Sequence, residues 1–298
     1  MRFAKPALTV EQQVELLEKR GMAIPDRTRA AHYLTHINYY RLRAYWLPFE
    51  EQAGDGSHRF RAGTSFEDAL TLYLFDRKLR LMLMDAIERV EVAVRTRWAH
   101  VLALRYGPHA YLRGEIFQEA WKYRRCLEGL TEEIARSHET FIDHYRTTYS
   151  EPELPPLWAA CEVMSFGQLS KWLENLKYRA DQKEIAAPYG LDPMVLGSFL
   201  HHLTHIRNLC AHHSRLWNRR LTFTMRLPRN PRHIVGWFNP AAERNLYNTL
   251  VMLTYLLGVI APHSSWKGRL KTLMAECPKA HPSAMGFPTE WEKLQVWK

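Results

Sequence analysis

A twenty-residue segment, residues 201–220 (HHLTHIRNLCAHHSRLWNRR), concentrates the side chains that could do chemistry in this sequence. It holds five histidines and four arginines. Histidine exchanges protons near neutral pH, because its unperturbed pKa is about 6.5. Arginine carries a permanent charge on a planar fork of donors that suits phosphate. Three interpretations of the segment compete.

The first interpretation is a metal site. His201 and His205 are four residues apart and His212 lies seven further on, so three imidazoles could share one stripe of a helix. The helix offers no Asp or Glu beyond its cap, however, and the sequence shows no fourth ligand. Because His-x-x-x-His pairs also arise by chance, we predict neither a metal nor another cofactor.

The second interpretation is structural, with the histidines against a helical core and the arginines in water. This would make the cluster a feature of the fold rather than of any reaction. We expect this role for His201, His202 and His205.

The third interpretation is a metal-free centre that cleaves a phosphodiester. Arg207, Asn208 and His212 form the pattern R-N-x-x-x-H. Such cleavage needs a cation to balance charge that grows on the phosphoryl oxygens and a group of near-neutral pKa to move protons. Arg207 would supply the first and His212 the second. Asn208 lies one helical turn before His212, so its amide could orient the imidazole.

The spacing of the two charged groups raises a geometric problem. Arg207 and His212 are five residues apart, which places them about 140° apart around an ideal helix. One helix would therefore present both to a single phosphate only with difficulty. Either the arginine curls across, or a second copy of the chain completes the site.

A capped helix must carry this segment. Asp192 followed by Pro193 is typical of an N-cap and the first turn of a helix. The apolar positions that follow predict its buried face: Leu196, Phe199, Leu200, Leu203 and Ile206.

The longest periodic segment begins at Ser65 and ends at Gly107-Pro108. Its apolar residues recur at steps of three and four, which predicts one helix of about ten turns. Asp76 with Arg80, and Glu91 with Arg95, stand at i,i+4 with the acid first, the favourable order for ion pairs.

The remaining pattern is also helical. Thr9 and Gln12 predict a capping box for a helix that ends at Gly21. Further helices are expected at about 27–37, 115–137, 139–148, 157–179 and 241–276, with loops at 53–58, 151–156 and 227–239. No segment alternates convincingly like a strand, although a small hairpin is allowed near Phe60 or at 221–225. We predict an all-α fold, with a helical extension over residues 1–50 and a helical core over residues 51–298, or one continuous domain.

The composition points to a polyanionic partner. The net charge is +10, and 29 arginines stand against 12 lysines, a bias that suits nucleic acid. A basic protein without such a partner remains the alternative. The scattered cysteines, the absence of an apolar leader and the short apolar run at 250–261 indicate a soluble, cytoplasmic chain without a membrane span.

The residues RNLCAHHSRLWNR at 207–219 resemble the signature of Abi-like abortive-infection proteins (the Abi_2, AbiD/AbiF-type family) of the HEPN superfamily. Four earlier blocks are similar to that family in the same order: KPALTVEQQVELLEKRGMAI, YLTHINYYRLRAYWLPF, LYLFDRKLRLMLMDAIERVEVAVRT and PLWAACEVMSFGQLSKWLENL. The resemblance covers residues 5–257, and the blocks together are more specific than any one of them.

The resemblance implies an HEPN-like helical bundle with N-terminal and C-terminal helical elaborations. Many HEPN proteins are metal-independent endoribonucleases whose R-x(4–6)-H residues meet across a dimer and leave a 2′,3′-cyclic phosphate and a 5′-hydroxyl. On this chain, Arg207 would clamp the phosphate, His212 would transfer the proton and Asn208 would be the polar residue after the arginine. With one motif in the chain, a homodimer is required. The family also implies phage defence, in some members restrained by a small non-coding RNA.

Two further sets of residues follow from these blocks. For Glu88, Glu91 and Arg95 we favour internal ion pairing over a supporting role near the site. The aromatic and basic residues at 38–49 could stack on bases, but a core role is the favoured interpretation. RNA contacts are expected from the basic residues after the motif: His213, Arg215, Arg219 and Arg220.

The sequence therefore predicts a homodimeric endoribonuclease acting on RNA without a metal. The alternative is an RNA-binding module with a silent centre that holds a structured non-coding RNA. A DNA-binding regulator is weaker, because no compact helix-turn-helix is visible.

Overall fold

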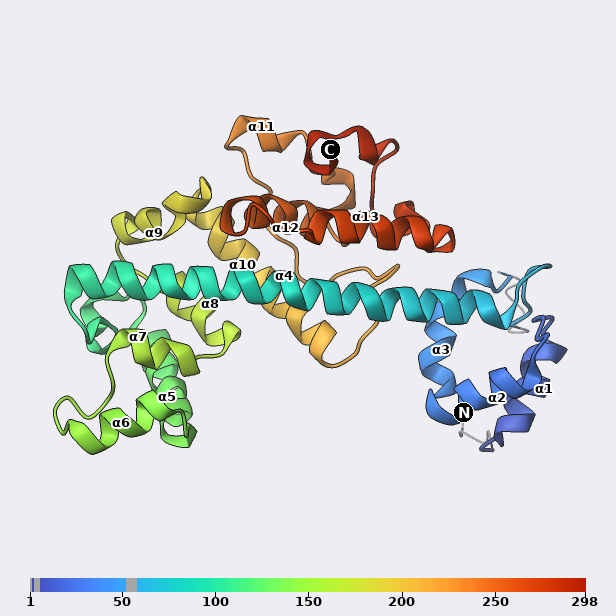
Figure 1. Ribbon diagram of the computed structural model, residues 1–298, viewed down its shortest axis with the longest axis horizontal. Helices are drawn as coiled ribbons and strands as arrows, with labels where there is room; N and C mark the ends of the chain where they lie inside the picture. Colours follow the sequence, from blue (N-terminus) through green and yellow to red (C-terminus); the bar gives the residue numbers. More distant parts are fainter. Residues whose placement is uncertain (1, 3–5, 52–57) are drawn as a thin grey trace. The chain divides into compact units, whose positions relative to one another are not determined.

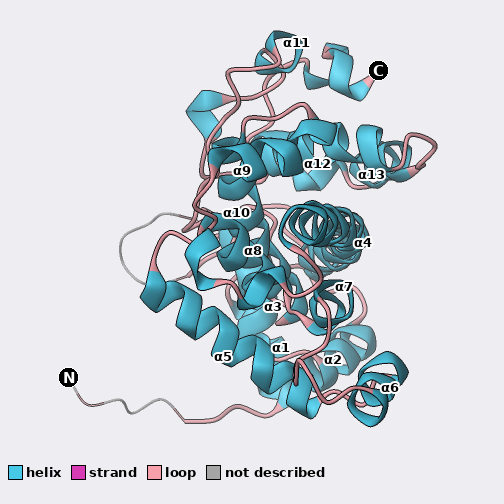
Figure 2. Cartoon of the chain, turned by 90° about the vertical axis from the view of Figure 1, so that its left-hand side faces the viewer, coloured by secondary structure: helices cyan, strands magenta, loops and turns pink. Residues whose placement is uncertain are grey.

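The computed structural model describes residues 2, 6–51 and 58–298, and throughout these ranges the chain is all-α (Figures 1 and 2). The prediction of the fold class is therefore confirmed. The α-helices are α1 Val10–Lys19, α2 Arg27–His36, α3 Tyr39–Trp46, α4 Phe66–Tyr106, α5 Ala120–Arg136, α6 Thr140–Thr148, α7 Leu157–Ala160, α8 Phe166–Glu174, α9 Arg179–Ala186, α10 Pro193–Ala211, α11 Arg232–Val235, α12 Tyr247–Ile260 and α13 Trp266–Glu276.

Extended pairing is minimal. Within the described ranges there are isolated bridges but no strand. One bridge joins Glu50 to Phe60, near which the sequence allowed a small hairpin. Residues 221–225 form none. The loop predicted at 53–58 lies outside the described residues except for His58.

The chain forms two compact units. The first comprises Met1–Arg80 and Leu270–His281, and the second comprises Leu81–Arg269 and Pro282–Lys298. Both α4 and α13 contribute residues to each unit. The predicted domain boundary after residue 50 stays a prediction. The two units are defined by compactness alone, and the first boundary between them along the chain follows Arg80.

The first unit begins with the predicted capping box. The backbone N–H of Thr9 donates to Gln12 Oε1 at 2.9 Å, and that of Gln12 donates to Thr9 Oγ1 at 3.2 Å. Gly21, at φ +92°, follows the end of α1. Such reciprocal bonds satisfy donors that the first turn of a helix leaves open.

The aromatic segment of α3 is mostly core. Tyr45 and Trp46 are buried, whereas Tyr40 is exposed. The Tyr45 hydroxyl donates to Asp76 Oδ2 at 2.6 Å, and Asp76 forms the predicted i,i+4 ion pair with Arg80. Burial, reinforced by the Asp76 carboxylate, raises the pKa of Tyr45. Tyr45 and Trp46 therefore serve the core, as favoured from the sequence.

The second unit holds the candidate site, which α4, α8 and α10 position. All five apolar residues predicted for the inner face of α10 are buried, and α8 packs against α10 and α5. Asp192 caps α10 by accepting from the backbone N–H of Met194 at 2.8 Å. Ser165 caps α8 in a second capping box with Gln168. These caps fix the start of both helices and hence the faces that they present.

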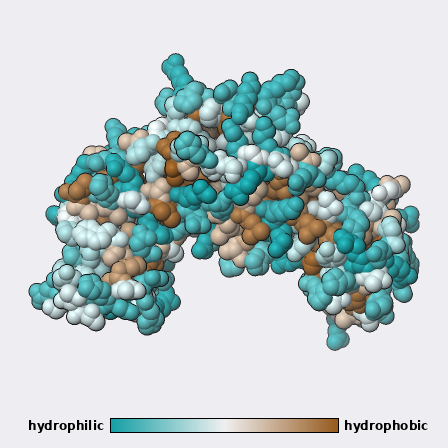
Figure 3. All heavy atoms as spheres, viewed as in Figure 1, coloured by the Kyte–Doolittle hydropathy of each residue, from teal (hydrophilic) through white to brown (hydrophobic). Residues whose placement is uncertain are grey.

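No helix in the described part of the chain combines the length and the apolarity that crossing a bilayer requires. The apolar run at 250–261 forms most of α12, whose residues from Leu250 to Leu253 are buried, as predicted. Hydrophilic residues cover most of the face shown in Figure 3, with apolar residues scattered among them.

Candidate active site

The R-N-x-x-x-H segment occupies the C-terminal end of α10. His212 is the C-cap residue, and its backbone N–H donates to the Asn208 carbonyl at 2.9 Å. His213 has a left-handed backbone (φ +57°) and donates to the Cys210 carbonyl at 3.0 Å, while Ser214 donates to the Leu209 carbonyl at 2.8 Å. These two bonds form a Schellman motif, with histidine where glycine is usual. The motif ends the helix and leaves His212 and His213 exposed.

Arg207 lies on the same helix end but is half-buried. Its Nη1 donates to Asn208 Oδ1 at 3.4 Å. The Asn208 amide therefore contacts Arg207, and within the described chain it makes no hydrogen bond to the His212 imidazole. That Asn208 orients His212 stays a prediction, while the contact that its amide oxygen makes here is with Arg207.

An acidic residue of α4, Glu91, interacts electrostatically with Arg207. Burial raises the pKa of the Glu91 carboxyl, while the positive charges of Arg95 and Arg207 oppose that rise. The positive charge of Arg207 thus lowers the pKa of the Glu91 carboxyl, although the two residues are far apart in the sequence. Glu88, which is exposed, raises the pKa of Glu91 further through its like charge.

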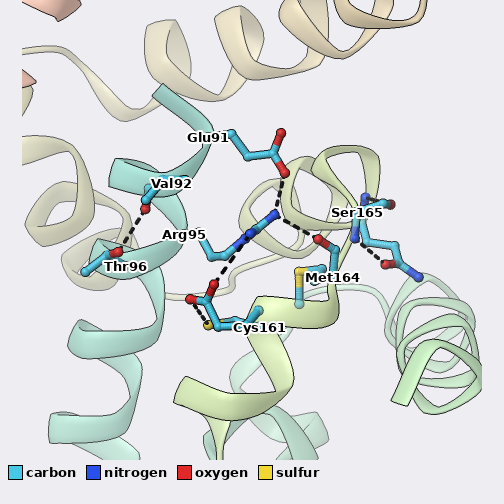
Figure 4. A network of polar contacts seen from close by, with 9 residues as sticks. Glu91, Val92, Arg95, Thr96, Cys161, Met164 and Ser165 are labelled. Carbon is cyan, nitrogen blue, oxygen red and sulfur yellow. Dashed lines mark hydrogen bonds and ion pairs between the residues drawn. The ribbon is translucent and has the colours of Figure 1, made fainter. Parts of the chain in front are cut away.

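Arg95 holds Glu91 in place and ties α4 to the turn before α8 (Figure 4). It forms the predicted i,i+4 ion pair with Glu91, and its Nη2 donates to the Met164 carbonyl at 2.9 Å. Its Nη1 lies 3.8 Å from Glu162 Oε2. The Arg95 and Glu91 side chains are only 11% and 18% exposed. The favoured interpretation of internal ion pairing is confirmed for Glu91 and Arg95, whereas Glu88 is exposed and forms no ion pair with a described residue.

We refer to Glu91, Arg95, Glu162 and Met164 as the α4 clamp. The sequence pattern predicted its i,i+4 pair but missed Glu162 and the Met164 carbonyl. No local signal could have revealed these two partners, because 69 residues separate Arg95 from Met164. Only the packed fold brings them together.

The three earlier histidines differ in their surroundings. His202 is buried, with Nδ1 2.9 Å from the Phe223 carbonyl and Nε2 2.8 Å from Thr249 Oγ1. His205 is half-buried and packs edge-on against the Phe223 ring, whereas His201 is exposed. The core position is thus confirmed for His202 and is wrong for His201, because adjacent helical residues point about 100° apart. In the described part of the chain, no three His, Cys, Asp or Glu side chains could together hold a metal ion.

His202 gives the protein a predictable acid sensitivity. Burial lowers the pKa of His202 to about 4, whereas the unfolded chain binds a proton at about 6.5. The neutral native histidine therefore stabilises the fold above pH 6.5, and that stability is lost as the pH falls toward 4. We expect a loss of up to about 3 kcal/mol from this residue.

Urea unfolding at several pH values measures this effect. The His202→Gln variant should have a flatter dependence of stability on pH between 7 and 4 than the wild type, whatever its stability at neutral pH. His201→Gln, which alters an exposed histidine, should retain the wild-type dependence. Equal slopes for wild type and His202→Gln would show that His202 does not titrate in this way.

The basic residues after the motif lie on the loop that leaves α10. Arg220 is exposed, and Arg215 and Arg219 are half-buried. Arg219 Nη1 donates to the Arg215 carbonyl at 3.3 Å. With the exposed His213, these residues keep several donors near the helix end where His212 lies.

The helices and this histidine–arginine helix end define an all-α protein with a cationic candidate site. The family model described as Abi-like protein matches residues 32–218, and the chain belongs to this family. The matched region contains the α4 clamp and the whole R-N-x-x-x-H segment. No curated protein and no solved structure gives a significant match.

Proposed function

We propose that this protein is a metal-independent endoribonuclease of an abortive-infection (phage-defence) system, active as a homodimer in the cytoplasm. The observation that carries the proposal is the arrangement at the end of α10. An exposed imidazole, His212, follows five residues after a cation, Arg207, and both lie within the region matched by the Abi-like family.

The proposed reaction is a transesterification within RNA. The ribose 2′-oxygen attacks the adjacent phosphorus and loses its proton, and the bond from phosphorus to the 5′-oxygen breaks. The leaving oxygen takes up a proton, so the products are a 2′,3′-cyclic phosphate and a 5′-hydroxyl. His212 moves protons in this scheme, and Arg207 balances the charge that grows on the non-bridging oxygens.

Asn208 supports Arg207 in this scheme. Its amide oxygen accepts from the guanidinium at 3.4 Å, which leaves the remaining N–H groups of Arg207 for a phosphate. The negative charge of Glu91 attracts the Arg207 guanidinium. Because Arg207 and His212 lie about 140° apart around the helix, we infer a site in which His212 of one subunit works with Arg207 of the other.

A second candidate is an RNA-binding module with a silent centre that holds a structured non-coding RNA. The charge of +10 favours this reading as much as the first. It also agrees with the neighbouring Glu91, which competes with a phosphate for Arg207. In either case an RNA partner would be bound through the basic helix end, with His213, Arg215, Arg219 and Arg220 contributing.

An assay of RNA cleavage in the presence of a metal chelator distinguishes the endoribonuclease from the RNA-binding module. Purified wild-type protein and the His212→Ala variant are incubated with total RNA in EDTA, and the RNA ends are mapped. We expect new 2′,3′-cyclic phosphate and 5′-hydroxyl ends with the wild type only. The matched control, His201→Ala, removes an exposed histidine from the same helix and should cleave like the wild type. If neither wild type nor variants cut RNA while all bind it, the binding module is the function.

A further inference from the structure

A cavity of about 770 Å³ opens at the start of α10, at the opposite end of the helix from Arg207. Side chains from the start of α9, the start of α10 and residues 226–230 line it, all within the second unit. We call it the arginine pocket; its walls include Arg179, Asp192, Met194, Arg226, Leu227 and Arg229.

The charge of the arginine pocket is unbalanced. It holds three guanidiniums and a single carboxylate, that of Asp192. Asp192 is already engaged, since Oδ1 caps the helix and Oδ2 pairs with Arg179 at 3.3 Å. Among the described residues, Arg226 and Arg229 form no ion pair with a carboxylate, and both are exposed. Two cations therefore face the cavity without a counter-charge.

The pocket is also held in place by the fold. The backbone N–H of Arg226 donates to Ser198 Oγ at 2.9 Å, which attaches the 226–230 segment to α10. The arginine side chains thus project from a backbone that is fixed at this point. A site whose backbone is preorganised loses less entropy when it orders a ligand.

Apolar groups share the pocket with these cations. Val195 and Pro228 are buried, Leu227 is half-buried, and the Met194 side chain is largely exposed. Accessible apolar groups beside guanidiniums suit a base, which stacks, joined to a phosphate, which accepts paired hydrogen bonds from the guanidinium N–H groups. The volume also falls in the range of small-molecule sites.

We propose that the arginine pocket binds a nucleotide, with its phosphate between Arg226 and Arg229 and its base against Met194 and Leu227. The nucleotide is either free or part of a single RNA strand, since both present the same chemistry. The pocket is separate from the candidate active site, because the 19 residues of α10 span about 28 Å. The proposal concerns binding alone and goes beyond the proposed cleavage.

The test compares two double variants that remove equal charge. Arg226→Ala/Arg229→Ala alters the pocket, and Arg124→Ala/Arg125→Ala removes two exposed arginines of α5. The first probe is a fluorescein-labelled 2′-O-methyl decanucleotide, which lacks the 2′-hydroxyl and cannot be cleaved by the proposed reaction. The second probe is AMP, with adenosine as its phosphate-free control, measured by calorimetry. Circular dichroism verifies that both variants are folded.

We expect the pocket variant to bind one of the probes at least tenfold more weakly than the control variant does. If the ligand is an RNA strand, the decanucleotide shows this loss, and the salt dependence of its log affinity falls by about 0.7 for the one lost phosphate contact. If the ligand is a free nucleotide, AMP shows it and adenosine does not bind.

Equal binding of both probes by the two double variants would overturn the proposal, as would measurable adenosine binding that is as tight as that of AMP. Neither result depends on whether the protein cleaves RNA. Conversely, a protein that fails to cleave RNA but loses decanucleotide binding in the pocket variant would retain this site and lose the proposed function.

Discussion

Chains that carry Arg207→Ala and chains that carry His212→Ala, when co-expressed, are expected to regain about a quarter of the wild-type RNA cleavage, because a symmetric dimer has two equivalent sites. Each variant alone should lose roughly 100-fold or more, since it lacks either the cation or the proton-transfer group in both sites. In a mixed dimer, one site receives the intact Arg207 of one chain and the intact His212 of the other. Random pairing makes about half of the dimers mixed.

A second mixture tests the same geometry from the other side. Wild-type chains are co-expressed with chains that carry both substitutions. If each site combines two subunits, the mixed dimers are inactive and about a quarter of the activity remains; if Arg207 and His212 of one chain work together, about half remains. Tagged subunits and analytical ultracentrifugation verify the mixed dimers. Mixed dimers of the two single variants that stay inactive would contradict the shared site.

Local sequence chemistry predicted much of the fold. The starts of two helices were predicted from Thr9 with Gln12 and from Asp192 with Pro193, and the structure confirms both. Such starts can be predicted because capping depends on residues only a few positions away. The i,i+4 ion pair of Glu91 with Arg95 was predictable for the same reason. A periodic pattern of apolar residues was also enough to predict helix α4 and the buried face of α10.

What the sequence could not predict depends on contacts between distant segments. The pairing of the Asn208 amide with Arg207 rather than His212 depends on side-chain reach, which spacing alone does not specify. The electrostatic interaction of Glu91 with Arg207 joins residues of α4 and α10, which are far apart in the sequence. The arginine pocket brings together Arg179 and Arg226, which lie on separate elements. The segment 226–230 is irregular, so it has no periodic pattern of apolar residues from which its structure could be predicted. The net charge of +10 favoured an anionic partner in the sequence analysis but gave no location for its binding site.

The α4 clamp leads to the largest expected effect on stability, through Arg95→Met. This substitution leaves the Glu91 carboxylate without its ion-pair partner in a site that is largely shielded from water. Breaking one partner of such a buried pair costs about 4 kcal/mol. The Met164 carbonyl also loses its donor. Urea unfolding followed by tryptophan fluorescence measures the loss, with the buried Trp98 and Trp172 as reporters in the second unit.

The pH dependence of this loss follows from the sign of the Glu91 shift. The folded chain already raises the pKa of Glu91, and removal of Arg95 should raise it further. An acid with a raised folded pKa is stabilising while protonated, and that contribution is lost as the pH rises through the folded pKa. Arg95→Met should therefore be closer to wild type at pH 5 than at pH 8.

The Arg95→Met substitution should also affect the candidate active site, through Arg207. Without Arg95, Arg207 is the remaining cation whose charge acts on the Glu91 carboxylate, and this attraction would compete with a phosphate for the guanidinium. Cleavage or RNA binding should then fall, and Glu91→Gln/Arg95→Met, which removes the negative charge, should recover most of both stability and activity. The matched control is Arg89→Met, which breaks an exposed i,i+4 pair with Asp85 on the same helix and should cost about 0.5 kcal/mol. If Arg95→Met costs no more than Arg89→Met, the clamp does not stabilise the fold; if the double variant is no better than Arg95→Met, the unpaired Glu91 charge is not the cause.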